Sequence, residues 1–178
     1  MYVLNCNAGL EGLWKAKVIA PGRLLFKSLP KDISSFNQIS RYITKFDFNN
    51  LEDIINKIKK INFRLVSPFL VRCNKQFRDD LSVLDIEKKV GEVLFNKGLK
   101  VDLTDPKTKV IVDIINDICI ISLSIKENLC KRHYYIRRNN QGTNPCIAAS
   151  LITLSGWKKN ESILDPFSKD GTILIEAY

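Results

Sequence analysis

The chain has 178 residues, of which 45% are hydrophobic and 26% are charged, a composition that excludes a disordered tail and is typical of a globular protein. Its 28 Lys and Arg residues exceed its 19 Asp and Glu residues, and the net charge of +9 favours a polyanionic partner, either nucleic acid or an anionic membrane surface. No apolar run approaches the roughly 20 residues that span a bilayer, and no signal-peptide pattern is visible, so we expect a cytoplasmic protein without a membrane-spanning segment.

The first 50 residues contain two strand patterns and one helical pattern. Alternating apolar and polar residues predict strands at 2–6 and 23–26. Farther along, apolar side chains stand three or four positions apart, which predicts a helix through Phe36, Ile39, Tyr42 and Ile43.

Two helices are predicted in the next segment. Apolar residues follow helical spacing from 51 to 61, and Asn50 is placed to cap that helix. A second helix is predicted to begin after Ser82, which opens a capping-box-like pattern with Asp85, and to stop at Gly98.

Strand patterns surround these helices. Residues 63–73 have strand composition, and Pro68 predicts an edge position or a bulge there. Two alternating runs, 110–114 and 121–125, flank a turn at 116–117 and predict an antiparallel hairpin. Helices on one face of a small mixed sheet predict an α+β domain from about residue 50 to about residue 125.

Positive charge is concentrated in two places. Residues 126–160 carry 7 basic and 1 acidic group and are predicted to form an exposed basic linker. In the predicted domain, cations lie close in sequence to Phe69 and Phe77, which suits phosphate contact beside base stacking. The same charges also suit a solvated sheet edge.

The last 17 residues follow a strand, loop and helix pattern. Residues 162–165 are apolar and end in Asp165, a loop with Gly171 follows, and an apolar stretch completes the chain. This order opens a doubly wound sheet, where ligands lie at the carboxyl ends of the strands and at helix N-termini. Taken alone, it is also compatible with an ordinary turn.

The cysteines predict neither a disulfide framework nor a metal site. The five cysteines are spread along the chain with no C-x-x-C pair, and His133 is the single histidine. We therefore expect no metal partner.

Several motifs resemble one enzyme family. Asp165-Pro-Phe-Ser-Lys-Asp-Gly-Thr172 is similar to D-P-F-C-G-S-G-T, the first S-adenosylmethionine-binding motif of RNA guanine-N2 methyltransferases that carry a THUMP domain. Residues 144–157 resemble the helix that precedes this motif in the family, and Leu129-Cys-Lys-Arg-His-Tyr134 resembles the L-H-K-R-G-Y linker. Segments between 69 and 117 follow the order and spacing of a THUMP domain, and residues 6–11 resemble an N-terminal G-L-E segment.

The resemblance implies an α+β fold in four parts. An N-terminal ferredoxin-like subdomain is expected at 1–48, and a THUMP RNA-binding domain at 49–125. A basic linker and the helix preceding the methyltransferase domain are expected at 126–160. The first strand, loop and helix of an incomplete Rossmann-like methyltransferase domain are expected at 161–178.

The resemblance also implies site residues. S-adenosyl-L-methionine, in the complete enzyme, is expected to contact the loop residues Asp165, Pro166, Phe167, Gly171 and Thr172. The cations near Phe69 and Phe77 and those of the basic linker are the residues expected to bind tRNA, near its acceptor stem and 3′ end: Arg72, Lys75, Arg78, Lys131, Arg132, Arg137 and Arg138. No catalytic residue is assigned.

The loop departs from the family at two positions. Lys169 and Asp170 stand where the family has glycine and serine, and a glycine allows close approach to a ligand. The family's downstream N/D-P-P-Y/F motif is not present in the chain. We therefore expect the RNA-binding part of a tRNA guanine-N2 methyltransferase that is inactive alone. The alternative is a noncatalytic RNA-binding adaptor, or the first half of a split enzyme that needs a second polypeptide.

Overall fold

The chain folds into two compact units in a computed structural model that describes residues 1–135 and 142–178. One unit is Ser40–Ser124, and the other combines Met1–Ile39 with Ile125–Tyr178. Strands pair in the order β2-β3-β1-β4-β7-β6-β5, which makes a seven-stranded mixed sheet with helices. Within the described ranges, no helix has the length and apolar character that crossing a bilayer requires.

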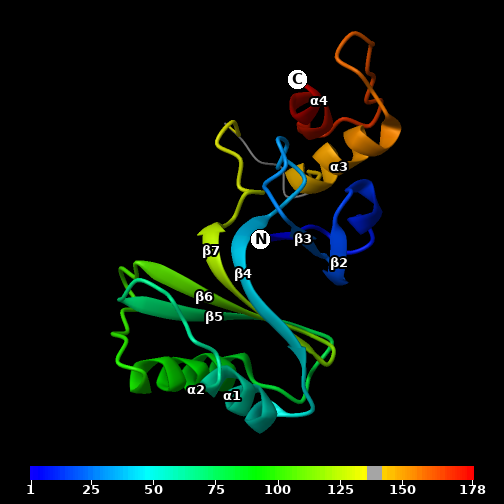
Figure 1. Cartoon of the computed structure of the whole chain (residues 1–178). Coiled ribbons are helices and arrows are strands. Elements are labelled where there is room, and N and C mark those ends of the chain that lie inside the picture. Colours follow the sequence, from blue (N-terminus) through cyan, green and yellow to red (C-terminus); the bar gives the residue numbers. More distant parts are fainter. Residues whose placement is uncertain (136–141) are drawn as a thin grey trace. The chain divides into compact units, whose positions relative to one another are not determined.

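The unit formed by residues 40–124 carries two helices on one face of its strands (Figure 1). Its elements are β4 (Gln38–Asp47), α1 (Leu51–Lys59), β5 (Phe69–Gln76), α2 (Val83–Asn96), β6 (Thr108–Ile115) and β7 (Ile118–Lys126). Strand β5 is parallel to β6, and β6 is antiparallel to β7. Apolar residues of both helices and all four strands pack into one core, which includes Ile54, Ile86, Val90, Val112 and Ile121.

Local signals predicted the helices and the hairpin of this unit. The Asn50 side chain accepts a hydrogen bond from the backbone N–H of Asp53 at 2.9 Å, and Ser82 caps α2 in the same way. Gly98 follows α2 with φ +85°, as a C-terminal stop requires. The predicted strand at 63–73 is shorter at its start than expected, because β5 begins only after Pro68.

The predicted helix through residues 36–43 is wrong. These residues enter β4, which lies between β1 and β7 in the sheet. The segment is rich in β-branched and aromatic residues, such as Ile39, Tyr42 and Ile43, which favour strands. Pairing with two neighbouring strands therefore outweighs the helical spacing.

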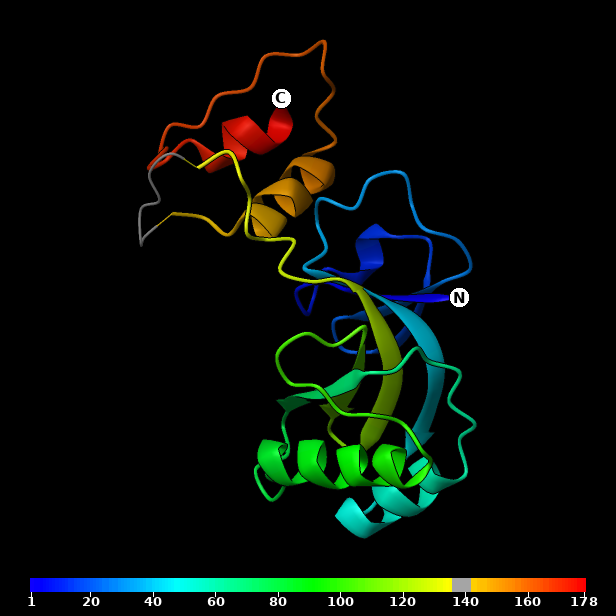
Figure 2. The same cartoon turned by 90° about the vertical axis from the view of Figure 1, so that its left-hand side faces the viewer.

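The other unit contains a small antiparallel sheet and two helices. Its strands are β1 (Tyr2–Asn5), β2 (Lys17–Ala20) and β3 (Arg23–Phe26), with a 3-10 turn η1 (Glu11–Leu13). Both β1 and β2 are antiparallel to β3, and their core surrounds Phe36, whose ring centroid lies 5.2 Å from that of Trp14. Helix α3 (Pro145–Ser155) packs beside α4 (Thr172–Ala177), as Figure 2 shows.

The strand predicted at 162–165 is not formed. Residues 161–171 contain neither helix nor strand, and Leu164 is 85% exposed. A strand takes its hydrogen bonds from neighbouring strands, and no described strand pairs with residues 162–165. The loop and helix that were expected to follow are present.

Candidate RNA and cofactor site

The loop that precedes α4 is held by its own side chains. Asp165 Oδ1 accepts a hydrogen bond from the backbone N–H of Phe167 at 3.1 Å, while the Phe167 ring is 88% exposed. Gly171 has φ +72°, a left-handed conformation that glycine adopts without strain. The backbone N–H of Thr172 donates to Asp170 Oδ1 at 3.2 Å, and the Thr172 hydroxyl hydrogen-bonds the same oxygen at 2.6 Å. Pro166, in the same loop, is exposed.

Arg132 anchors the segment after β7 to α4. Its Nε and one terminal nitrogen donate to the two carboxylate oxygens of Glu176 at 2.8 and 3.0 Å. The other donors reach the carbonyl oxygens of Leu129 and Ser34, each at 2.6 Å. The Glu176 side chain is 6% exposed and that of Arg132 is 17% exposed, so this is a shielded, bidentate ion pair.

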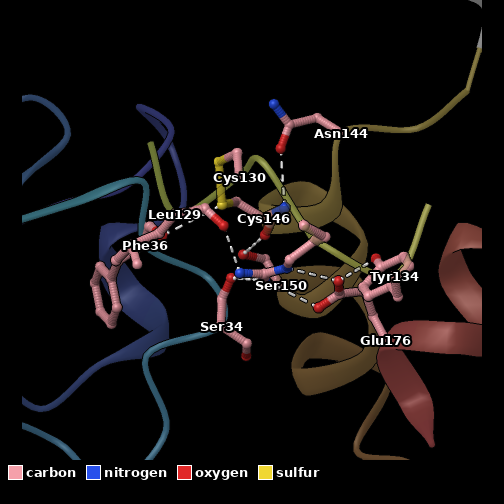
Figure 3. The surroundings of a disulfide bond; sticks show 10 residues. Ser34, Phe36, Leu129, Cys130, Tyr134, Asn144, Cys146, Ser150 and Glu176 are labelled. Carbon is pink, nitrogen blue, oxygen red and sulfur yellow. Dashed lines mark hydrogen bonds and ion pairs between the residues drawn. A yellow bond between two sulfur atoms is a disulfide. The ribbon is translucent and has the colours of Figure 1, made fainter. Parts of the chain in front are cut away.

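Two tyrosines complete this anchor. The Tyr134 hydroxyl donates to the Glu176 carboxylate (Figure 3). Burial and this hydrogen bond raise the pKa of Tyr134, and the hydrogen bond with Glu176 raises the pKa of Arg132. The Tyr135 and Thr172 hydroxyls lie 2.6 Å apart, so both ends of α4 are tied to residues 132–135.

These contacts differ from those expected of Arg132 as a residue that binds RNA. Four of its five N–H donors are already used within the protein. Sequence analysis missed this anchor, because Arg132 and Glu176 are 44 residues apart and no local spacing links them.

A disulfide joins Cys130 to Cys146, so the expectation of no disulfide is wrong. The spacing of the cysteines in the sequence does not predict this bond. It forms because the fold brings the segment after β7 to the N-terminus of α3. There the two Cα atoms are 5.6 Å apart, within the range that a disulfide bridges. The other three cysteines are free and buried.

In the unit 40–124, two of the three predicted RNA-binding cations make contacts with carboxylates. An Arg72 terminal nitrogen lies 3.5 Å from Glu87 Oε2, while its side chain stays 54% exposed. Arg78 pairs with Asp80 through two bonds of 2.7 and 2.8 Å and with Asp117, and its guanidinium lies 5.0 Å above the Phe48 ring.

Lys75 and Lys131 have fewer restraints. Lys75 Nζ donates to a single backbone carbonyl, that of Leu81, at 2.8 Å. Lys131 is exposed and its ammonium has no partner in the parts of the chain that the structure describes. Arg137 and Arg138 lie outside the described residues.

Two family models match this chain. The THUMP domain model matches residues 47–124, and the model of the RMKL-like methyltransferase domain matches residues 132–178. The chain therefore combines a THUMP domain with a segment that matches the RMKL-like methyltransferase domain. The THUMP match covers both helices and the hairpin of the unit 40–124, and the second match covers Arg132, the disulfide-bonded α3 and the loop before α4.

Two proteins that are similar to this chain are named as tRNA guanine-N2 methyltransferases. The chain is 29% identical to the tRNA (guanine(6)-N2)-methyltransferase of Methanocaldococcus jannaschii, in an alignment that covers 99% of the chain and 55% of that relative. It is 31% identical to the tRNA (guanine(10)-N2)-dimethyltransferase of Methanothermobacter thermautotrophicus, covering 98% of the chain and 52% of that protein. The chain spans about half the length of the curated relatives it matches.

Solved structures share the fold. TrmN from Thermus thermophilus superposes with a TM-score of 0.71 at 21% identity, covering 99% of this chain and 60% of that one. SMU.472, solved in complex with SAH, gives a TM-score of 0.71 at 20% identity, covering 99% of this chain and 54% of that one. At these identities the likeness concerns the fold alone.

Proposed function

We propose that this chain is the tRNA-binding part of a methyltransferase that transfers a methyl group from S-adenosylmethionine to the exocyclic N2 amine of a tRNA guanine. The observation that carries the proposal is the order of the two matches, a THUMP domain followed directly by the start of a methyltransferase domain. The names of the relatives supply the tRNA and the guanine. Such a protein meets its substrate where tRNA matures, which we take to be the cytoplasm.

The proposed arrangement of domains follows the family. A ferredoxin-like subdomain at 1–48 and the THUMP domain at 49–125 would bind the acceptor stem and the 3′ end. Residues 126–160 would connect them to the methyltransferase segment at 161–178. The exposed Lys131 and Arg72 are the described cations best placed to meet phosphates, while Arg132 and Arg78 serve mainly to hold the protein together.

The loop fits S-adenosylmethionine only in part. Gly171 supplies the left-handed backbone that a close approach needs, and Asp165 stands at the position of the family's acidic residue. Lys169 replaces a glycine, and no strand precedes the loop. The described residues therefore do not complete a cofactor site, and catalysis would need a further set of strands.

The test has two stages. A filter-binding titration should show that the chain prefers tRNA with an intact 3′ end to duplex DNA of equal length, and equal affinity would contradict RNA recognition. Next, the chain is incubated with labelled S-adenosylmethionine and unmodified tRNA. We expect no methyl incorporation above a control without protein, and incorporation would contradict the proposed division of labour.

A split enzyme or an adaptor is the second candidate. The apolar groove lined by Trp157, Ile163, Leu174 and Tyr178 is open in this chain and suits burial against a further polypeptide. Adding the catalytic half of a relative as a separate polypeptide should restore transfer in a split enzyme. Tight tRNA binding without transfer, with both halves folded, would favour the adaptor.

A further inference from the structure

The disulfide between Cys130 and Cys146 is open to solvent on one side only. Cys146 is 1% exposed, and its sulfur lies 3.3 Å from the carbonyl oxygen of Phe36 (Figure 3). Cys130 lies in the segment after β7 and keeps part of its surface exposed. A dissolved thiol can therefore approach the bond at Cys130, while protein atoms block Cys146.

Cys146 also lies at the N-terminus of a helix, which suits a leaving thiolate. It is the second residue of α3, and its backbone N–H is capped by the Asn144 side chain at 2.9 Å. A thiolate near a helix N-terminus is stabilised by the helix dipole and the free N–H groups. Attack of a dissolved thiol on Cys130 would therefore release Cys146 as a thiolate beside the start of α3.

The other three cysteines do not compete for reagents. Cys6, Cys73 and Cys119 are buried in the two cores. Burial raises the pKa of Cys6 to about 11 and that of Cys73 to about 12, and it raises the pKa of Cys119 as well. They form almost no thiolate at neutral pH, and thiolate is the reactive species.

We propose that Cys130 and Cys146 form a reversible thiol–disulfide site, in which Cys130 exchanges with small thiols and disulfides in solution and Cys146 resolves the mixed disulfide. This site is additional to RNA binding and does not depend on it.

The exchange balances with glutathione as the co-reactant. In oxidation, the Cys130 thiolate attacks oxidised glutathione and one glutathione leaves as a thiolate. The Cys146 thiolate then attacks the sulfur of Cys130, the protein disulfide forms, and a second glutathione leaves. Two protein thiols thereby lose two electrons and two protons, and one oxidised glutathione becomes two reduced ones. Reduction follows the same steps in reverse.

The redox state of these two cysteines determines whether the chain between them is closed into a covalent loop. Oxidation closes the chain over a sequence separation of 16, so the segment after β7 is tied to α3 by a bond in addition to the anchor of Arg132. Closing a loop of this length restricts the unfolded chain, and reduction should lower the midpoint of thermal unfolding by roughly 5–10 °C.

The test identifies which cysteine forms the mixed disulfide with glutathione first. The whole chain is reduced, freed of reductant, exposed to oxidised glutathione, and quenched with an alkylating reagent at successive times. Digestion with trypsin then separates Cys130, in residues 127–131, from Cys146, in residues 139–158. In the unsubstituted chain we expect glutathione first on residues 127–131, and afterwards a link between the two peptides.

Two variants separate the roles of the cysteines. Cys146→Ser should accumulate glutathione on Cys130, because nothing resolves it, and Cys130→Ser should acquire at least tenfold less glutathione on Cys146. The control Cys6→Ser should react like the unsubstituted chain. Early glutathione on residues 139–158 of the unsubstituted chain, or no link between the peptides, would overturn the proposal. Because that time course uses no variant, the result stands even if a variant fails to fold.

Discussion

Glu11 shows how one carboxylate holds two turns together. Its two oxygens accept hydrogen bonds from the backbone N–H groups of Gly9 and Gly22. Gly22 has φ +68°, and a Cβ there would lie 2.8 Å from the carbonyl oxygen of Cys6. The G-L-E segment noticed in the sequence thus has a structural role, because it fixes the turn between β2 and β3.

The charge state of Glu11 should make stability depend on pH. Burial alone would raise the pKa of Glu11, but the backbone N–H groups of Gly22, Glu11 and Gly9 lower it below its ordinary value. A lowered pKa in the folded state gives stability that is present above the unfolded pKa of about 4.3 and is lost as pH falls through the folded pKa. Glu11→Gln should therefore unfold at a lower temperature than the unsubstituted chain at pH 7, and this gap should narrow in acid.

Circular dichroism melts between pH 3 and pH 7 measure that gap. The control is Glu92→Gln, since Glu92 is exposed on α2 and no described residue pairs with its side chain. A gap that stays constant through the acid range would contradict the role of the carboxylate charge.

Two glycines should respond in opposite directions to alanine. Gly22→Ala requires an unfavourable φ and a clash with backbone, so it should destabilise the chain by about 2 kcal/mol or more. Gly91 lies inside α2 with nothing within 4 Å of an added Cβ, so Gly91→Ala should stabilise by about 0.5–1 kcal/mol. Urea titrations monitored by fluorescence compare the unfolding free energies of the two variants. A loss of stability in Gly91→Ala would contradict the claim that α2 has room for a methyl group at this position.

At the scale of elements, α4 depends on its partners rather than on its own length. It has only six residues, and isolated helices shorter than about 12 residues are marginal in water. The Arg132–Glu176 ion pair and the Tyr135–Thr172 contact supply the stability that the helix lacks.

Arg132→Gln should detach α4. Removing the guanidinium leaves the shielded Glu176 carboxylate without its cation, which should cost on the order of 3 kcal/mol. Amide hydrogen exchange of residues 172–177 should become much faster, while exchange in α2 stays unchanged. Lys131→Gln is the matched control because it changes a neighbouring exposed cation, and equal effects of the two variants would argue against the anchor.

The elements that the sequence predicted correctly share a local cause. Helices α1 and α2 carry their apolar spacing and their capping residues, Asn50 and Ser82, within a few positions of each other. The strand at 38–47 and the missing strand at 162–165 were predicted wrongly, because strand formation depends on partners that are distant in the sequence.

The candidate site follows the same rule. The loop with Gly171 was found from a local motif, and its positive φ agrees with the need for glycine. The Arg132–Glu176 pair and the Cys130–Cys146 bond join residues 44 and 16 positions apart, and both were invisible to motif reading. The residues expected to contact tRNA and cofactor stay predictions.

For the whole molecule, excess positive charge should govern the affinity for tRNA. Contacts with phosphates release counterions, so the logarithm of the binding constant should fall steeply and linearly with the logarithm of salt concentration. Replacing both Arg137 and Arg138 by Glu should weaken binding more than replacing Lys59 and Lys60.

The choice of control cations matters. Lys57 is a poor control, because its ammonium holds Asp53 at 2.9 Å and caps the carbonyl of Asp47. Lys59 and Lys60 are exposed on α1 or at its end. Equal losses in the two double variants, measured by filter binding at three salt concentrations, would indicate a diffuse field and no special role for the linker.

The division of the chain into two units means that they can fold at different times during synthesis. The unit 40–124 is continuous, whereas its companion needs residues 1–39 and 125–178 together. At about 5–20 residues per second, the ribosome needs roughly 3–11 s to add residues 125–178 after position 124. During that interval the THUMP domain can already be folded, while the other unit still lacks its residues 125–178. A nascent chain paused there would lack Leu129, which packs against the core around Phe36, and would leave that core partly uncovered.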